Sequence, residues 1–403
     1  MNILFLSDNF WPESNAPASR TFEHCTEWVR LGERVTVITC APNFPAGKVY
    51  PGFKNKLWTV GYINGIRVVR VWSYMAPNAG FARRIVDFMS FAIASFLAGL
   101  FEKADVIVAT SPQFFTTWSA VGLSIFKRRP WVFELRDLWP DSLVAVGIKQ
   151  QGRLLTFLAK LELALYRNAS LVVAVTDAFK ENLVRRGIPE DKISVVYSGV
   201  DRERFKPVPR DEELASQLQI NEKFVVGYIG THGMAHGLAT FIEAADRLPQ
   251  PVHLLFVGDG AERNRLNALV TARNLKNVTM IGQVSKEEIV RYWSVIDVAL
   301  VPLRQSDTFL TVVPSKIFEA AAMAKPILLG VDGQARAILE RFEAGLHFAP
   351  EDFGAFSLGV RSLMTDASLY SRLQEGCREM SRAFDRRSLA SKMLEVLRRV
   401  AKK

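Results

Sequence analysis

The chain contains 403 residues, 49% of them hydrophobic, which at this length predicts two domains with sizeable cores rather than one. Its formal net charge is +10, but the basic residues are scattered and no motif interleaves them with aromatic residues. This pattern argues against a nucleic-acid partner and favours a phosphorylated substrate or an anionic bilayer. The three cysteines form no CxxC pair, as is typical of a reducing compartment.

The chain opens on a short apolar strand with no basic leading segment and no cleavage site, so we expect a cytoplasmic protein without a secretion signal. Short segments rich in Val and Ile then alternate with helical periods, which is typical of a parallel sheet covered on both faces. The expected strands are residues 3–7, 35–39, 68–72, 106–110, 132–135, 171–175 and 193–197, and helices are expected over 18–31 and 152–166.

The longest apolar stretch covers residues 85–101, follows Arg83 and Arg84, and is interrupted by Asp87 and Ser90. It falls short of the roughly twenty residues that a membrane-spanning helix needs. Two interpretations stay open. The stretch is either a helix buried in the core or a helix lying in the plane of an anionic membrane surface.

A charged, proline-containing segment over residues 201–213 predicts a linker, after which the second half repeats the alternation of the first. Each half is therefore expected to be a complete doubly wound unit. A ligand should bind at the carboxyl ends of the strands, in the cleft between the units. Strands are expected over residues 224–229, 253–257, 278–281, 298–301 and 327–329, and helices over 238–247, 261–273, 286–293 and 314–323.

Glycine-rich turns follow two strands of the second half. The first includes Gly230 and Thr231 and leads into a helix start, a geometry that lets backbone amides approach a diphosphate; Gly258 follows the next strand. His236 either faces a phosphate there or is a loop histidine of no special role. The chain has no P-loop and no GxGxxG turn after its first strand, which argues against nicotinamide or flavin chemistry.

The segment over residues 314–326 predicts the front of a helix aimed at a ligand. Pro314 suits a first helical turn, and Lys316 adds a positive charge beside the free amides, which predicts a phosphate site. Glu319 follows within the same turn, where its carboxylate can accept hydrogen bonds from a ribose. The alternative is a surface lysine and a surface glutamate on an ordinary amphipathic helix.

The sequence predicts no metal site, because its five histidines show no HExxH pattern and the carboxylates form no Asp-x-Asp pair. Transfer from a nucleotide sugar would then need cations and amides of the protein to stabilise the leaving diphosphate. By their positions in the sequence, the groups expected to stabilise the diphosphate are Lys316, Arg304 and the loop over residues 308–315.

Short motifs recur along nearly the whole chain, at residues 10–13, 136–140, 197–201 with Phe205, 257–260, 281–284, 298–304 and 314–326, and at Phe384. Together these motifs resemble those of retaining GT-B glycosyltransferases of family 4, also called group 1. Within that family the chain is similar to bacterial surface-polysaccharide transferases that handle N-acetylated 6-deoxy sugars, such as the N-acetyl-L-fucosaminyltransferases. The resemblance implies an α/β fold of two Rossmann-like doubly wound domains facing a central cleft.

The resemblance also implies site residues by family position. Glu319 would hold the ribose of a UDP-sugar, and Lys316 with the amides of Val312 and Val313 would face the diphosphate or the donor sugar. Gln283 and Val284 would lie beside the base. Arg136 and Asp137 stand where many relatives have His-Asp, so they would contact the donor sugar or the acceptor. The implied catalytic set is Arg136, Asp137, Lys316 and Glu319.

Three departures from the family pattern concern the donor. Thr311 stands where the family has the first glutamate of its E-x7-E pair, and Thr231 and His236 replace its usual Arg and Lys. Residues 15–20 replace the paired glycines of the N-terminal loop. The changes indicate a subgroup with its own donor contacts or a weakened enzyme. In the first case, Lys316 and Arg304 would supply the missing positive charge.

The expected organisation is an acceptor-side domain over residues 1–205, a nucleotide-sugar domain over 206–383 and a helix over 384–403 that returns to the first domain. We expect a metal-independent hexosyltransferase, without a cofactor beyond its nucleotide sugar, acting on a polyprenyl-diphosphate-linked glycan at the inner face of the cytoplasmic membrane. Its product would be an O-antigen, capsule or exopolysaccharide. The alternatives are a nucleotide-sugar epimerase or hydrolase of the same fold, and a non-catalytic nucleotide-sugar-binding protein.

Overall fold

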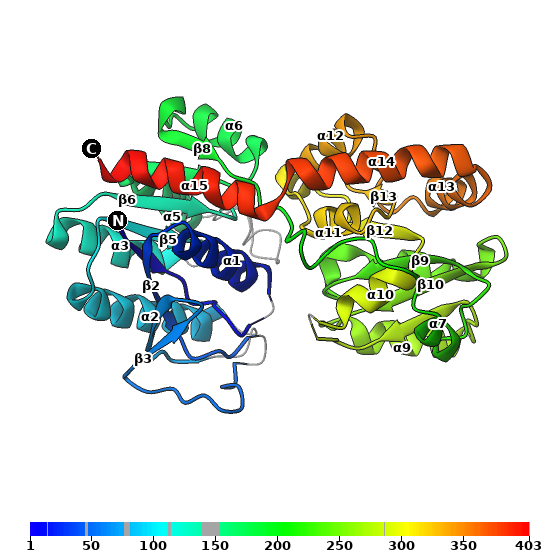
Figure 1. Cartoon of the computed structure of the whole chain (residues 1–403), viewed down its shortest axis with the longest axis horizontal. Coiled ribbons are helices and arrows are strands. Elements are labelled where there is room, and N and C mark those ends of the chain that lie inside the picture. Colours follow the sequence, from blue (N-terminus) through cyan, green and yellow to red (C-terminus); the bar gives the residue numbers. More distant parts are fainter. Residues whose placement is uncertain are drawn as a thin grey trace. The chain divides into compact units, whose positions relative to one another are not determined.

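The computed structural model describes residues 1–13, 15–44, 47–75, 81–111, 114–138, 153–285 and 287–402. Residues 139, 140, 152 and 286 and the side chain of Arg84, on which some of the expectations above fall, lie outside this described part. The chain divides into two compact units (Figure 1). Unit 1 comprises Met1–Ser198 and Arg386–Lys403, and unit 2 comprises Gly199–Asp385.

Unit 1 contains an eight-stranded sheet in the order β3-β4-β2-β1-β5-β6-β7-β8. Its strand pairs are parallel except β3 with β4, an edge hairpin whose first strand the sequence did not indicate. The strands are β1 (Asn2–Leu6), β2 (Arg34–Cys40), β3 (Trp58–Ile63), β4 (Ile66–Val71), β5 (Val106–Thr110), β6 (Trp131–Leu135), β7 (Leu171–Ala174) and β8 (Ile193–Val195).

Helices cover both faces of this sheet because successive residues of its central strands are apolar on both sides. Ile3 and Phe5 pack with α1 and α15, and Leu4 and Leu6 pack with the helices of the opposite face. The helices of unit 1 are α1 (Ala16–Arg30), α2 (Phe81–Phe101), α3 (Phe114–Lys127), α5 (Arg153–Asn168), α6 (Asp177–Arg185) and α15 (Arg386–Ala401).

Helix α15 belongs to unit 1 although it follows unit 2 in the sequence. The buried indole of Trp28 in α1 donates a hydrogen bond of 2.8 Å to the carbonyl oxygen of Ala390. Arg398 forms an ion pair with Glu33 at 2.6 Å, and Leu389, Met393 and Leu397 are buried beside β1. This explains why α15 alternates apolar and basic residues: one face enters the core and the other stays in water.

Unit 2 contains a six-stranded parallel sheet in the order β11-β10-β9-β12-β13-β14. Its strands are β9 (Phe224–Ile229), β10 (Val252–Val257), β11 (Val278–Ile281), β12 (Val298–Pro302), β13 (Ile327–Gly330) and β14 (Gly345–His347). Its helices are α7 (Glu212–Gln217), α8 (Leu238–Glu243), α9 (Arg263–Ala272), α10 (Ile289–Val295), α11 (Lys316–Ala322), α12 (Gln334–Arg341), α13 (Phe353–Thr365) and α14 (Ala367–Ala383).

The strand order reverses once in each unit. Strand β1 lies between β2 and β5 in unit 1, and β9 lies between β10 and β12 in unit 2. Loops that leave the carboxyl ends of such strands diverge to opposite sides of the sheet, and the space between them is the usual ligand site of doubly wound folds. The expected site residues follow β6 in unit 1 and β9, β10, β11 and β12 in unit 2.

Helix α2 contains the long apolar stretch. It is neither wholly buried in the core nor wholly on the surface. Phe91, Ser95 and Ala98 are buried, whereas Ile93 and Leu97 are more than half exposed. The described residues include no helix with the length and apolar character needed to cross a membrane.

Candidate functional site

Two glycine turns bring the backbone of unit 2 together at the carboxyl ends of β9 and β10. Gly230 and Gly258 adopt φ angles of +147° and +145°. A Cβ atom at Gly258 would lie 2.0 Å from the carbonyl oxygen of Gly230, and one at Gly260 would lie 2.6 Å from that of His232. No other residue type fits this approach without displacing the backbone.

Lys316, the first residue of α11, extends its side chain to this turn. Its Nζ donates a hydrogen bond of 2.7 Å to the hydroxyl of Tyr228 in β9 and lies 3.9 Å from the centroid of that ring. A Cβ at Gly230 would lie 2.9 Å from the same nitrogen. Burial lowers the pKa of Lys316 to about 7, and the carboxylate of Glu319 opposes this shift. Lys316 and Gly230, predicted separately, therefore share one site.

Tyr228 connects the lysine to the loop that follows β9. Its hydroxyl donates a hydrogen bond of 2.6 Å to the carbonyl oxygen of Thr231. Its ring centroid lies 5.9 Å from that of His232 and 5.6 Å from that of His236. Burial lowers the pKa of His232 to about 4 and that of His236 to about 3, so both imidazoles are neutral at physiological pH.

Buried nitrogens in this region lack hydrogen-bond partners among the described residues. They are both ring nitrogens of His232 and the Nε atoms of Arg263 and Arg304. A buried donor without a partner is rare in folded proteins and often marks the place of a ligand or an ion. The described residues therefore leave hydrogen-bonding capacity for an anion near the turn after β9.

Arg304 follows β12 and lies against the loop that ends in η2 (Met234–His236). Its backbone N–H donates a hydrogen bond of 2.8 Å to Ala235, and its Cγ lies 3.3 Å from where a Cβ of Gly237 would be. His236 Nδ1 lies 3.4 Å from the carbonyl oxygen of Pro302. Arg304 and His236 are thus neighbours, although they are far apart in the sequence.

The loop before α11 differs in detail from the expected helix front. Helix α11 begins at Lys316 rather than Pro314 and has seven residues. The amide of Val312, expected to face a diphosphate, donates to the carbonyl oxygen of Phe309 at 3.2 Å and would have to exchange that bond for a ligand. Thr311 ends η4 (Asp307–Thr311), and its hydroxyl lies 3.4 Å from the carbonyl oxygen of Thr308. Glu319 stands in the first turn of α11, as expected.

The expected base-binding pair, Gln283 and Val284, follows β11, and Gln283 is exposed. A missed residue lies beside them. A Cβ at Gly282 would be 3.2 Å from Nη2 of Arg263, and the positive charge of Arg263 helps to lower the pKa of His232. Its place at the start of α9, directly after a glycine turn, was a usable signal. The sequence carried no such signal for Tyr228, because a tyrosine in an apolar strand is expected to be an ordinary core residue.

Arg136 and Asp137 lie in unit 1, directly after β6. The amide N–H of Arg136 donates a hydrogen bond of 2.8 Å to Ser111 Oγ, and its guanidinium donates one of 3.2 Å to the carbonyl oxygen of Pro17. Burial lowers the pKa of Arg136 to about 10 and raises that of Asp137 to about 6, the second shift being opposed by Arg136. The pKa of Asp137 therefore lies close to the physiological pH range, in which the carboxyl group can exchange a proton.

A second polar cluster lies at the same edge of the unit 1 sheet. Arg20 donates hydrogen bonds to Glu134 at 2.8 Å and to the carbonyl oxygen of Val196 at 3.0 Å, and both side chains of this ion pair are buried. Burial raises the pKa of Asp8, after β1, to about 7. None of these three side chains was in the predicted catalytic or nucleotide-binding set.

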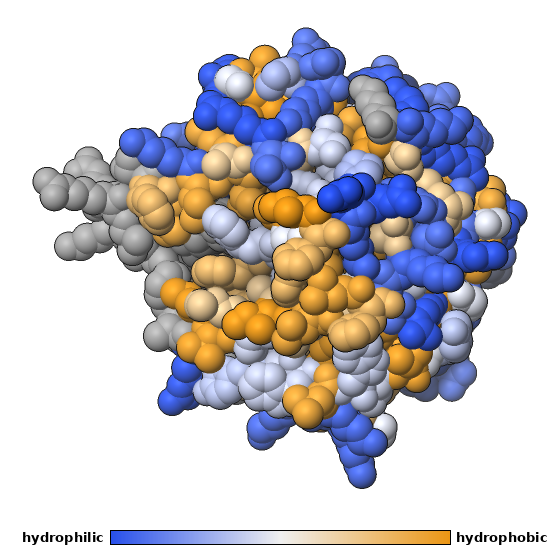
Figure 2. Space-filling view, turned by 90° about the vertical axis from the view of Figure 1, so that its left-hand side faces the viewer, coloured by the Kyte–Doolittle hydropathy of each residue, from blue (hydrophilic) through white to orange (hydrophobic). Residues whose placement is uncertain are grey.

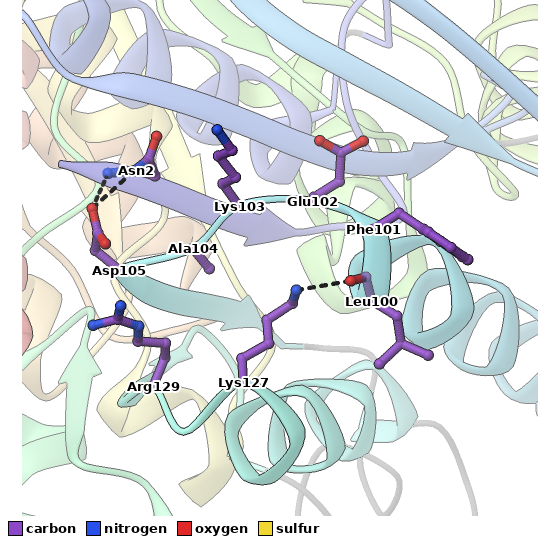
Figure 3. Close-up of a pocket in the computed structure, with 9 residues that line it drawn as sticks. All are labelled: Asn2, Leu100, Phe101, Glu102, Lys103, Ala104, Asp105, Lys127 and Arg129. Atoms are coloured by element: carbon purple, nitrogen blue, oxygen red, sulfur yellow. Dashed lines mark hydrogen bonds between the residues drawn. The ribbon is translucent and has the colours of Figure 1, made fainter.

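A hollow of about 460 Å³ also lies in unit 1, but at the opposite edge of the sheet (Figure 3). Its lining comes from the first residue of β1, from residues that precede β5 and β6, and from the ends of α2 and α3. It is therefore separate from the carboxyl ends of the strands. The lining residues are Asn2, Leu100, Phe101, Glu102, Lys103, Ala104, Asp105, Lys127 and Arg129.

No cluster of three or more His, Cys, Asp or Glu side chains that could hold a metal ion occurs in the described ranges. The groups that the structure offers to an anion in unit 2 are instead Lys316 and the unpartnered nitrogens of His232, Arg263 and Arg304.

Two family models match the chain in succession. "Glycosyltransferase Family 4" matches residues 18–204, and "Glycosyl transferases group 1" matches residues 209–380. Among curated proteins, the chain is 24% identical to WcaI of Escherichia coli, a provisionally named colanic acid biosynthesis glycosyl transferase, over 90% of this chain and 92% of that protein. It is 26% identical to a GDP-mannose-dependent alpha-mannosyltransferase of Mycobacterium tuberculosis, over 86% of this chain and 83% of that protein.

Solved structures share the fold at low sequence identity. The sucrose-phosphate synthase of Thermosynechococcus elongatus superposes with a TM-score of 0.79 at 20% identity, covering 99% of both chains. Anabaena HepE in complex with UDP-glucose gives a TM-score of 0.73 at 19% identity, covering 98% of this chain and 99% of that chain. These likenesses confirm the predicted fold of two Rossmann-like α/β domains.

Proposed function

The chain belongs to the group 1, family 4 glycosyltransferases, and we propose that it transfers a sugar from a UDP-sugar to a glycan acceptor, with retention at the anomeric carbon and without a metal ion. The observation that carries this proposal is the partly buried Lys316 ammonium at the glycine turn after β9. It lies in the half of the chain that matches the group 1 model, at the edge of the sheet where doubly wound folds bind ligands.

The proposed reaction breaks the bond between the anomeric carbon and the diphosphate oxygen and forms one between that carbon and an acceptor hydroxyl oxygen. Negative charge develops on the leaving diphosphate, and the proton of the acceptor hydroxyl passes to it. A cation held partly out of water stabilises such charge more strongly than one in bulk water. Lys316 would supply the cation, with unpartnered N–H groups of Arg263 and Arg304 as further donors. Glu319, in the first turn of α11, would hold the ribose.

The choice of UDP rests on the sequence resemblance and on the HepE complex with UDP-glucose, a protein of the same fold. One relative is named as dependent on GDP-mannose, so a nucleotide comparison is the informative test. Other relatives are named for colanic acid and amylovoran biosynthesis, which supports a role in bacterial polysaccharide assembly. We propose an N-acetylated 6-deoxyhexosamine as the donor sugar and a polyprenyl-diphosphate-linked glycan as the acceptor.

Arg136 and Asp137 would serve the acceptor or the donor sugar. Asp137, with a pKa near 6, could accept a hydrogen bond from a sugar hydroxyl, and the partly buried Arg136 could face a phosphate. Asn replacement of Asp137 keeps its shape but removes the charge. We expect Asp137→Asn to lower the transfer rate while leaving UDP affinity unchanged.

The decisive experiment has a binding arm and a transfer arm. The purified chain is screened by thermal shift against UDP, GDP and a panel of nucleotide sugars, because a ligand that binds only the folded state raises the melting temperature. The stabilising donor is then incubated with lipid-linked glycan acceptors, and also alone. Sugar appearing on the acceptor with retained anomeric configuration is the expected result. A donor altered without acceptor would indicate an epimerase or hydrolase, and tight binding without transfer would indicate a binding protein; either overturns the proposal.

A further inference from the structure

We infer that α2, α3 and β3 of unit 1 form a docking surface for an anionic phospholipid bilayer. This inference extends the proposed function, since a lipid-linked acceptor would be met at a membrane, but it concerns a surface separate from the predicted site residues. It rests on the distribution of exposed apolar side chains and of the cations around them. Figure 2 shows the side of the molecule on which apolar residues gather in a continuous band.

Helix α2 exposes apolar residues where a surface helix of a soluble domain exposes polar ones. Beyond Arg83, the exposed side chains of its described residues are Val86, Met89, Ile93, Leu97 and Phe101. Their spacing of three or four residues places them on one stripe of the helix. The opposite face is already packed in the core through Phe91, Ser95 and Ala98, so the stripe is a second apolar face.

Helix α3 and strand β3 extend this face on either side. The exposed side chains described for α3 are Trp118, Ile125 and Phe126, of which Ile125 and Phe126 are 70% and 71% exposed. The rings of Phe96 and Phe126 lie 5.8 Å apart and join α2 to α3. The rings of Trp58 and Phe101 lie 5.9 Å apart and join α2 to β3. The apolar residues therefore form one patch rather than scattered single side chains.

Helices α2 and α3 are packed close together. A Cβ at Gly99 of α2 would lie 2.4 Å from Leu123 of α3, and a Cβ at Gly122 of α3 would lie 2.8 Å from Phe96 of α2. The hydroxyl groups of Ser95 and Ser119 lie 3.2 Å apart within this contact. Neither helix can rotate its apolar stripe inward without opening this packing.

Cations border the patch where α2 and α3 end. Lys103, Arg128 and Arg129 are exposed there, and Lys103 and Arg129 line the hollow of Figure 3 together with Lys127. The two carboxylates of that hollow do not cancel the positive charges of these four residues. Glu102 pairs with Arg67 at 2.9 Å, and Asp105 accepts hydrogen bonds from Asn2. The rim therefore offers net positive charge beside an apolar patch, which matches the phosphates and acyl chains of an anionic leaflet.

The charge of the rim also decides between a bilayer and a second copy of the chain. A symmetric dimer through this patch would bring like parts of the two surfaces near each other and place two cationic rims at one interface. Like charges facing each other oppose association, and the chain as a whole carries +10. With an anionic bilayer, the electrostatic interaction of the rim is attractive instead of repulsive.

The test is co-sedimentation of the full chain with vesicles, in the absence of nucleotide and acceptor. Vesicles of phosphatidylglycerol and phosphatidylcholine are compared with phosphatidylcholine alone. The variant Leu97→Glu/Phe126→Glu replaces two exposed patch residues, and Leu358→Glu, at a 67% exposed position of α13 in unit 2, is the matched control. We expect binding to anionic vesicles that falls about tenfold or more in the double variant and not in the control. Removing Lys103 and Arg128 should weaken binding about fivefold per charge.

Several results would overturn the inference. One is wild-type chain that stays in solution with anionic vesicles at low salt. Another is a double variant that sediments as strongly as the wild type. The third is a wild-type dimer, seen by analytical ultracentrifugation, that the double variant dissociates. UDP binding and transfer to a detergent-dispersed acceptor are measured on the same preparations, so loss of vesicle binding and failure of the proposed function are told apart.

Discussion

The ammonium nitrogen of Lys316 lies 2.7 Å from the hydroxyl oxygen of Tyr228 and 3.9 Å from the centroid of its ring. The first residue of α11 is thereby fixed to the carboxyl end of β9, two elements separated by 88 positions in the sequence. Tyr228 is a positioning residue in this arrangement, because it acts on a ligand through Lys316. Its hydroxyl accepts from the lysine and donates to Thr231, so the ammonium has one defined position.

The first prediction concerns the pH dependence of donor use. Lys316 has a pKa of about 7 and must be protonated to attract a diphosphate, so kcat/KM for the donor should fall as the pH rises above about 7. Tyr228→Phe removes a hydrogen bond to the charged form, which lowers the pKa further. We expect its alkaline limb at lower pH and an activity about tenfold lower near pH 7. Lys316→Arg should abolish the alkaline limb if Lys316 is its source, and an unmoved profile in both variants would refute the assignment.

The glycine turn gives a prediction about stability. A Cβ at Gly258 would lie 2.0 Å from the carbonyl oxygen of Gly230, whereas Gly61 in β3 has open space around it. Gly258→Ala should cost about 2 kcal/mol or more of unfolding free energy and weaken nucleotide binding, because the backbone must move. Gly61→Ala is the control and should change stability by less than about 0.5 kcal/mol. Urea unfolding measures both, and equal effects would contradict the close approach.

Helix α15 gives a prediction about unit 1. Leu397 is fully buried against the unit 1 sheet, and Leu358 of α13 is 67% exposed. Leu397→Ala should destabilise the chain by about 2–5 kcal/mol through the lost burial and the cavity that remains. Leu358→Ala should have little effect. Hydrogen exchange would show the loss of protection in β1 and α1 rather than in unit 2, and loss confined to unit 2 would be inconsistent with the observed packing.

Asp8 makes unit 1 sensitive to pH. Its folded pKa of about 7 lies above the ordinary value of 3.8, so between these pH values the folded state binds more protons than the unfolded state. The free energy of unfolding should therefore decrease as the pH rises from about 4 to about 7, by at most about 4 kcal/mol. Asp8→Asn should flatten this dependence. A wild-type stability that rises through the window, with the variant parallel to it, would show that burial does not raise this pKa.

Periodicity predicted most strands of both sheets because buried parallel strands are continuous apolar runs. It did not indicate β3, whose exposed Trp58, Val60 and Tyr62 are paired only on one side, as an edge strand. The three residues of β14 were too few for any period to show. Segment 85–101 was ambiguous because α2 is apolar on two faces, one in the core and one exposed.

The sequence placed Gly230, Lys316 and Arg304 at the carboxyl edge of the sheet because their loops follow strands, and the structure brings Lys316 to Gly230 there. The candidate site could not be predicted where a site residue lies within a strand, as Tyr228 does, because apolar surroundings give an aromatic residue no distinguishing signal. The amide of Val312 shows a second limit of prediction from the sequence. Whether a loop N–H is free depends on the local turn, and this one donates to Phe309.

Calorimetric titration of UDP into the wild type, Lys316→Met and the Leu358→Ala control near pH 6.5 tests the central claim most directly. Lys316→Met should keep or raise the melting temperature. In the wild type, the folded pKa of Lys316 is about 7 and lies below the ordinary 10.5, so burying the charged lysine lowers stability at this pH. UDP affinity should fall about tenfold or more in Lys316→Met and stay unchanged in the control. Equal UDP affinity in a folded Lys316→Met variant would contradict the claim that this lysine holds the diphosphate.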